Sequence, residues 1–96
     1  MIPKTWDCSS VQVQIQQSWD ISEHGRCEYD KRKIWLNANN DTMIQWRTMF
    51  HELAHFSLTA QALKVEEMDE EAVANWAEGF VAEILNQVCK CQTGAK

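Results

Sequence analysis

Residues 42–59 read TMIQWRTMFHELAHFSLT, and this stretch predicts a helix around which the rest of the chain must pack. It contains no Gly or Pro, and its apolar residues recur at intervals of three and four. One face carries Met43, Trp46, Phe50 and Leu53, and the adjacent face carries Ile44, Thr48, His51, His55 and Leu58. Because so much of its circumference would be covered, we expect this helix to be central.

The start of this helix has three candidate caps. Thr42 and Gln45 fit the capping-box pattern, in which each side chain satisfies a free backbone N–H group of the other residue. Asp41 or Asn40 could cap the helix instead, since both are favoured cap residues. They end the segment 37–41, whose composition is typical of a turn.

The first third of the chain has the patterning of β-strands. Val11, Val13 and Ile15 alternate with Gln residues, which predicts a strand with one apolar face. Residues 26–29 and 33–37 fit two further strands joined by a short link. Short links between successive strands predict a three-stranded antiparallel meander.

A second helix is predicted after the central one. Asp69 is a good cap, and Glu70 and Glu71 complement the dipole of the first turn. A broad apolar stripe carries the helix to about Val88, and residues 92–96 are expected to be a disordered tail. The predicted fold is α+β: one domain, residues 1–96, with a small antiparallel sheet, the central helix and a second packed helix.

Composition restricts the location and the partners. Ninety-six residues suit one domain, and a net charge of -5 argues against nucleic-acid binding through a basic surface. The N-terminus lacks the apolar core of a signal peptide, and no apolar run approaches membrane-spanning length. Four Cys residues form no CxxC pair. We therefore expect a cytoplasmic chain with free thiols and no membrane partner.

Within the central helix, His51-Glu52-Leu53-Ala54-His55 reads HExxH, the pattern of zinc metallopeptidases. Residues four apart lie one above the other on a helix, so His51 and His55 can direct two imidazoles at one ion. Glu52 lies about 100° round the helix from His51, where it could reach a water on that ion. The motif predicts zinc as the cofactor, two His ligands and Glu52 as the general base.

A third zinc ligand must come from elsewhere in the chain, because a catalytic zinc usually has three protein ligands and one water. His24 is the only other His. The acidic run at residues 66–71, EEMDEE, is the main source of carboxylates.

The segments 49–56, MFHELAHF, and 71–77, EAVANWA, resemble the ImmA/IrrE-type zinc metallopeptidases, a gluzincin-like family. That family carries HELGH followed by a helix with an ExxAN element, and this chain has Ala54 at the Gly position. The resemblance spans roughly residues 25–88 and implies a minimal zincin-like core. It also implies that Glu71 is the third ligand, with Glu70 and Glu67 as alternatives in the same acidic run.

The resemblance implies a zinc-dependent endopeptidase that cleaves a protein or peptide substrate. Zinc-bound water, activated by Glu52, would attack the peptide bond. The expected substrate is a repressor-like regulator in the cytoplasm of a bacterial or phage-infected cell. The alternative is a non-catalytic module in which zinc stabilises a fold that sequesters a protein partner.

Three further residues are candidates for supporting roles. Tyr29 or His24 could donate a hydrogen bond to the oxyanion of the reaction. Arg47 lies four residues before His51, on the same helix face. It could either orient a carboxylate or form a surface salt bridge.

Overall fold

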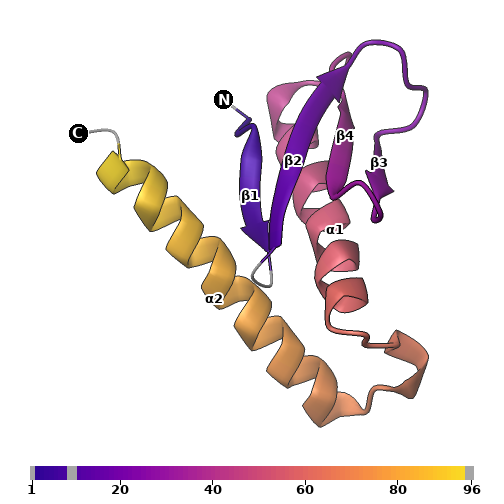
Figure 1. Cartoon of the computed structure of the whole chain (residues 1–96), viewed down its shortest axis with the longest axis vertical. Coiled ribbons are helices and arrows are strands. Elements are labelled where there is room, and N and C mark those ends of the chain that lie inside the picture. Colours follow the sequence, from indigo (N-terminus) through magenta and orange to yellow (C-terminus); the bar gives the residue numbers. More distant parts are fainter. Residues whose placement is uncertain (1, 9–10, 95–96) are drawn as a thin grey trace.

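The computed structural model describes residues 2–8 and 11–94, with side chains described as far as Val88. The elements in chain order are β1 (Thr5–Cys8), β2 (Val11–Ser18), β3 (Gly25–Glu28), β4 (Lys33–Asn37), α1 (Thr42–Ala60), the short 3₁₀ helix η1 (Val65–Glu67) and α2 (Glu70–Gly94), as Figure 1 shows. The α+β class is confirmed. In the described part of the chain, no helix is long and apolar enough to cross a membrane.

The strand arrangement differs from the predicted meander. The described strands form one four-stranded sheet in the order β1-β2-β4-β3, and its central pair, β2 and β4, is parallel. Only the antiparallel β3–β4 hairpin was predicted correctly. The physical reason is burial: β2 and β4 each bury alternate aliphatic side chains, whereas β3 reads GRCE and has little apolar surface to bury. An antiparallel meander would have put this weakly apolar strand in the centre of the sheet.

The sequence reading also missed β1. Trp6 and Cys8 are buried and alternate with exposed Thr5 and Asp7, which is the period-two pattern of a strand. β1 pairs antiparallel with β2, with Trp6 opposite Val13. A run of four residues holds only two such alternations, so the pattern was too short to stand out.

Helix α1 begins where predicted and ends one residue beyond the predicted end at Thr59, and Asp41, one of the three candidate caps, caps it. The Asp41 Oδ1 atom accepts a hydrogen bond from the backbone N–H of Ile44 at 2.9 Å. Gln45 is buried, and its Nε2 donates to the backbone carbonyl of Asn40 at 2.8 Å. The capping box between Thr42 and Gln45 is therefore wrong, because Gln45 is used to tie α1 to the preceding turn.

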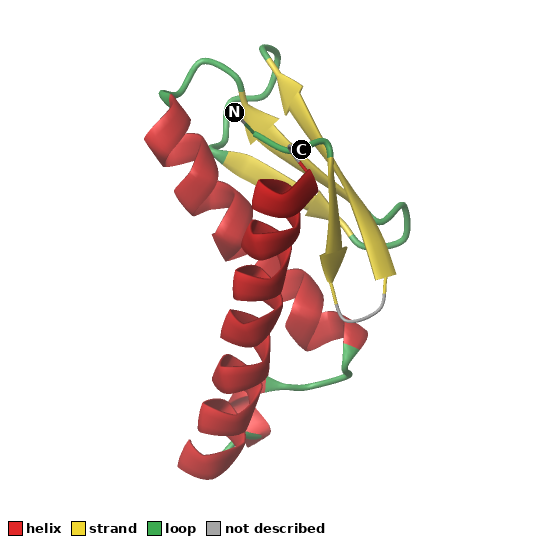
Figure 2. Cartoon of the chain, turned by 90° about the vertical axis from the view of Figure 1, so that its left-hand side faces the viewer, coloured by secondary structure: helices red, strands yellow, loops and turns green. Residues whose placement is uncertain are grey.

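The core lies between the sheet and the helices, which both lie on the same side of the sheet (Figure 2). Its buried apolar members are Ile2, Trp6, Cys8, Val13, Ile15, Ile34, Leu36, Met49, Leu53 and Phe56. Met43 stays 69% exposed, so the buried face of α1 is centred on Met49 and Leu53. The outer face of β2 carries the exposed Gln residues, as its alternation predicted.

Helix α2 begins as predicted and ends later. Asp69 Oδ1 accepts a hydrogen bond from the backbone N–H of Ala72 at 2.8 Å, which confirms it as the cap. The helix continues to Gly94, beyond the expected end near Val88. Residues 95–96 of the predicted tail lie outside the described residues.

The described contacts of α2 are with β1 and with one side of α1. Trp76 Nε1 donates to Ser57 Oγ at 3.1 Å, and farther along Gln87 Nε2 donates to Asp7 Oδ2 at 3.4 Å. Figure 1 shows α2 crossing from the end of α1 toward β1. The apolar residues Val73, Val81, Leu85 and Val88 remain 40–60% exposed, so α2 buries only part of its apolar stripe.

Candidate metal centre

His51 and His55 converge on the exposed side of α1. Their Nε2 atoms are 3.2 Å apart, and the two rings lie nearly perpendicular with centroids 4.8 Å apart. Two imidazoles bound tetrahedrally to one zinc at about 2.05 Å each would have nitrogens about 3.4 Å apart. The pair therefore fits two of the ligand positions of a zinc ion.

The structure does not bring Glu71 to this pair. Helix α2 is attached to α1 through Ser57, which lies about 200° round the helix from His55. Glu71 is exposed on the first turn of α2. Among the described residues, no group of three or more His, Cys, Asp and Glu side chains could hold a metal ion. Ligation by Glu71, Glu70 or Glu67 stays a prediction from the family resemblance.

Glu52 lies beneath the edge strand β3. A Cβ atom on Gly25 would come within 3.6 Å of Glu52 Cγ. Burial, and after it the charge of the nearby Glu52 carboxylate, raise the pKa of the Cys27 thiol to about 11. The half-buried Glu52 thus lies alongside Gly25 and Cys27, which share the inner face of β3 because they are two residues apart.

Burial disfavours the thiolate form of Cys27. Cys27 and Cys8 are free thiols among the described side chains, as predicted, while Cys89 and Cys91 lie outside them. With a pKa of about 11, the Cys27 thiol is protonated at neutral pH. A thiol in this state is a poor nucleophile and a poor metal ligand.

A cleft of about 500 Å³ opens beside the motif. It is lined by His24, Gly25, Ile44, Arg47, Thr48, His51 and Glu52. Among the described strands β3 pairs only with β4, so its other edge is free. A free strand edge presents backbone groups that can pair with an extended chain.

The two candidate oxyanion donors lie in different places. His24 lines the cleft, whereas Tyr29 lines a separate hollow of about 220 Å³ with Phe56 and Thr59. The Tyr29 ring lies 6.0 Å from that of Phe56, and its hydroxyl hydrogen-bonds to Thr59. Partial burial also raises the pKa of this hydroxyl. Of the two candidates, only His24 is in the cleft.

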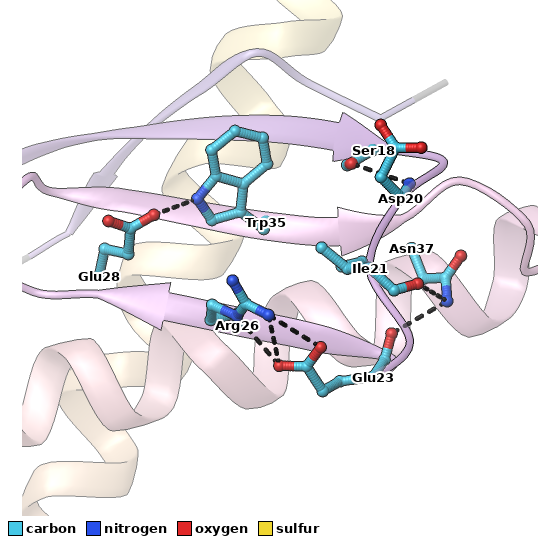
Figure 3. A network of polar contacts seen from close by, with 8 residues as sticks. All are labelled: Ser18, Asp20, Ile21, Glu23, Arg26, Glu28, Trp35 and Asn37. Carbon is cyan, nitrogen blue, oxygen red and sulfur yellow. Dashed lines mark hydrogen bonds and ion pairs between the residues drawn. The ribbon is translucent and has the colours of Figure 1, made fainter.

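Asn37 positions the cleft, a role that the sequence reading missed. This buried side chain donates from Nδ2 to the backbone carbonyls of Ile21 and Glu23, at 3.1 and 3.0 Å, as Figure 3 shows. The backbone N–H of Asn37 also donates to the carbonyl of His24 at 3.0 Å. These bonds fix the loop that brings His24 and Gly25 to the cleft. Asn is also a common turn residue, so an Asn at the end of a strand does not by itself indicate that its side chain fixes a neighbouring loop.

Gly25 is required by the close approach of β3 to α1. A Cβ atom there would lie 2.5 Å from Thr48 Cγ2 and 3.1 Å from the backbone oxygen of Trp35. We expect Gly25→Ala to lower the free energy of unfolding by about 2 kcal/mol, because β3 must move away from α1. Urea denaturation measures this change.

A second substitution tests the cause of that loss. Thr48→Ala removes the methyl group that the new Cβ would meet, so Gly25→Ala with Thr48→Ala should regain more than half of the loss. Thr48→Ala alone is the matched control. Strict additivity of the two single changes would show that the Thr48 contact is not the cause.

Comparison with known proteins gives one match. The family model of the IrrE N-terminal-like domain, peptidase family M78, matches residues 7–85. Searches of curated proteins and of solved structures returned no match. The matched range contains the HExxH helix, the cleft and most of α2, so the chain belongs to the ImmA/IrrE-type peptidase family M78.

Proposed function

We propose that this chain is a zinc-dependent endopeptidase whose ion is held by His51 and His55. The observation that carries the proposal is the 3.2 Å separation of the two Nε2 atoms, which suits a shared tetrahedral ion. Membership of a peptidase family supports the same chemistry. Zinc content and peptide hydrolysis, measured together on wild type and Glu52→Gln, test the proposal.

The residues of the cleft have separable tasks in this proposal. When bound, zinc would lower the pKa of a coordinated water to about 7 and polarise the scissile carbonyl. Glu52 accepts the proton of the attacking water and later delivers it to the leaving amine.

The edge of β3 is the proposed site for the substrate backbone. β3 is an edge strand, and its inner face lies against α1 at Thr48 and Glu52. An extended peptide paired with this edge would gain main-chain hydrogen bonds and pass the carboxylate of Glu52. This arrangement suits a protein or peptide substrate.

The setting of the reaction is also a proposal. The acidic net charge of -5 favours a protein substrate over nucleic acid. The family resemblance favours a repressor-like regulator in the cytoplasm of a bacterial or phage-infected cell.

Zinc stoichiometry tests the ligand set. After dialysis against zinc and then buffer, we expect about one ion per wild-type chain, and His51→Ala or His55→Ala should weaken zinc binding about a hundredfold or more. Glu71→Gln should weaken it similarly if Glu71 is the third ligand, whereas Glu70→Gln and Glu67→Gln should not. Elemental analysis with a competing chelator gives the affinities.

Glu66→Gln is the matched control for this set, since it removes the same charge from the exposed η1 segment. A wild-type zinc affinity in His51→Ala would remove the metal centre from the proposal. Wild-type affinity in all three of the other Glu variants would leave the third ligand elsewhere.

The second candidate function is a zinc-stabilised module that sequesters a protein partner without cleaving it. The favouring observation is that the described residues include no third ligand beside the His pair. Metal binding can stabilise a small domain without supporting turnover. Such a binder would keep its partner affinity in Glu52→Gln, whereas a peptidase would lose hydrolysis.

A further inference from the structure

We propose that Arg47 and His24 form a binding subsite for a carboxylate of the peptide, at the end of the cleft nearer the start of α1. The inference rests on the proposed function for the identity of the ligand as a peptide. The subsite itself is inferred from the arrangement of charges in the cleft.

Arg47 is a cation that lines the cleft. It lies one helical turn before His51 on α1 and lines the cleft with that residue. Among the described residues Arg47 has no ion-pair partner. The expected surface salt bridge is therefore not formed, and the guanidinium is free to bind an anion.

Three other cations near the sheet, Arg26, Lys31 and Lys33, are already engaged. Arg26 pairs with Glu23 at 3.0 Å, as Figure 3 shows, and Lys31 pairs with Glu28 at 3.3 Å. Lys33 lies over the ring of Trp35, 5.0 Å from its centroid. The free guanidinium of Arg47 is thus distinct from these engaged groups, in a chain whose net charge is -5.

The acidic side chain of the cleft, Glu52, is displaced from Arg47 along the axis of α1. Glu52 is five residues farther along α1, about 7.5 Å along the helix axis. A peptide carboxylate near Glu52 would be repelled, whereas one near Arg47 would be attracted. The cleft therefore favours a carboxylate displaced from the scissile bond toward the start of α1.

His24 supplies a second donor at this end of the cleft. The Asn40 amide lies 2.9 Å from His24 Nδ1, and its nitrogen can only donate, so Nδ1 accepts. This leaves Nε2 as the ring nitrogen that can donate to a bound anion. Asn37 holds the His24 loop in place, so little ordering entropy is lost on binding.

Of the chemical groups that a peptide offers, a carboxylate fits Arg47 and His24 best. Arg presents a planar fork that binds carboxylates with two parallel hydrogen bonds, and the His24 N–H can add a third. The carboxylate could be an Asp or Glu side chain or the chain-terminal group of the substrate. The two sources share the same chemistry and can be separated by experiment.

The test uses three octapeptides of otherwise identical composition. One carries an internal Glu and an amidated C-terminus, one carries Gln and a free C-terminal carboxylate, and one carries Gln and an amidated C-terminus. Affinity is measured by chemical-shift titration of the isotopically labelled full chain at low temperature. Hydrolysis of the same peptides is followed in parallel by mass spectrometry.

We expect at least one carboxylate peptide to bind wild type about fivefold more tightly than the neutral peptide, and this preference to disappear in Arg47→Gln. Preference for the Glu peptide would identify a side-chain carboxylate, and preference for the free C-terminus a terminal one. Arg47→Lys should keep part of the preference, since it retains the charge and loses the fork. Lys64→Gln removes the same charge from a residue outside the cleft and should keep the preference in full.

Equal binding of all three peptides by wild type would overturn the subsite, as would a carboxylate preference that survives Arg47→Gln. The outcome for the peptidase is separate. Arg47-dependent binding without hydrolysis would keep the subsite and reject the peptidase, whereas hydrolysis without carboxylate preference would do the reverse. Because Arg47 is exposed, its replacement should leave the fold intact, which circular dichroism checks.

Discussion

Glu52→Gln is expected to lower the rate of peptide hydrolysis about a thousandfold while the chain keeps its full zinc content. Gln has nearly the same size as Glu but cannot accept the proton of the attacking water. His51 and His55, which hold the proposed ion, are unchanged. In this variant the rate of hydrolysis should therefore fall while the zinc content stays the same.

The position of Glu52 makes this separation measurable. Its side chain is half-buried in the cleft, alongside Gly25 and Cys27 of β3, and the isosteric Gln fits the same space. The described contacts of β3 with α1 should therefore persist. A fall in rate can then be attributed to the lost base.

The assay follows cleavage of a peptide mixture by mass spectrometry on zinc-loaded protein. Glu66→Gln, with its side chain exposed in η1, is the charge-matched control and should hydrolyse at the wild-type rate. Equal hydrolysis by wild type and Glu52→Gln would reject the general-base role. Loss of zinc along with activity would mean that Glu52 serves the metal instead.

Leu53→Ala is expected to be the most destabilising of the substitutions considered, lowering the free energy of unfolding by about 3 kcal/mol. Leu53 follows Glu52 directly in the HExxH motif, but it is fully buried in the core. Removing its branched end leaves a cavity lined by core residues. In a domain of this size the melting temperature should fall by roughly 15 °C.

Met43→Ala is the matched control, because Met43 lies on the same helix and is 69% exposed. Its effect should stay within about 0.5 kcal/mol. Urea and thermal denaturation of both variants measure the difference. Similar losses for the two would contradict the placement of the α1 face that carries Leu53 in the core.

The candidate site was predicted where it depends on one helix. The approach of His51 and His55 follows from four-residue spacing on α1, and the structure places their Nε2 atoms 3.2 Å apart. The roles of Gly25, Cys27 and Asn37 were not predicted. Each acts through a segment distant in sequence, so spacing alone held no signal for it.

The fold shows the same limit in its strands. Alternating residues placed β2 correctly, but a period of two does not specify which strand lies next to which. Short connections suggested neighbours in sequence order, and the burial demands of β2 and β4 overrode that expectation. The strand order follows from burial: the two strands with the most apolar side chains, β2 and β4, occupy the centre of the sheet.

Helix α2 shows why the third ligand could not be fixed from sequence. Its apolar stripe is broad enough to pack in more than one way, and the structure buries Trp76 and Phe80 more than Val81 or Leu85. That choice attaches α2 to the Ser57 side of α1, away from the His pair. The amphipathic pattern specified the helix and left its docking open.

The sequence by itself determined the elements whose cause is local: the helix of residues 42–60, its His pair and the Asp69 cap of α2. These depend on contacts within about one turn, which periodicity and capping describe completely. The tertiary structure alone decided the parallel β2–β4 pair, the cover of Glu52 by β3 and the place of Arg47 in the cleft. These features arise because segments distant in sequence bury their apolar faces together. Their packing brings polar groups side by side, and the spacing of those groups along the chain does not predict this proximity.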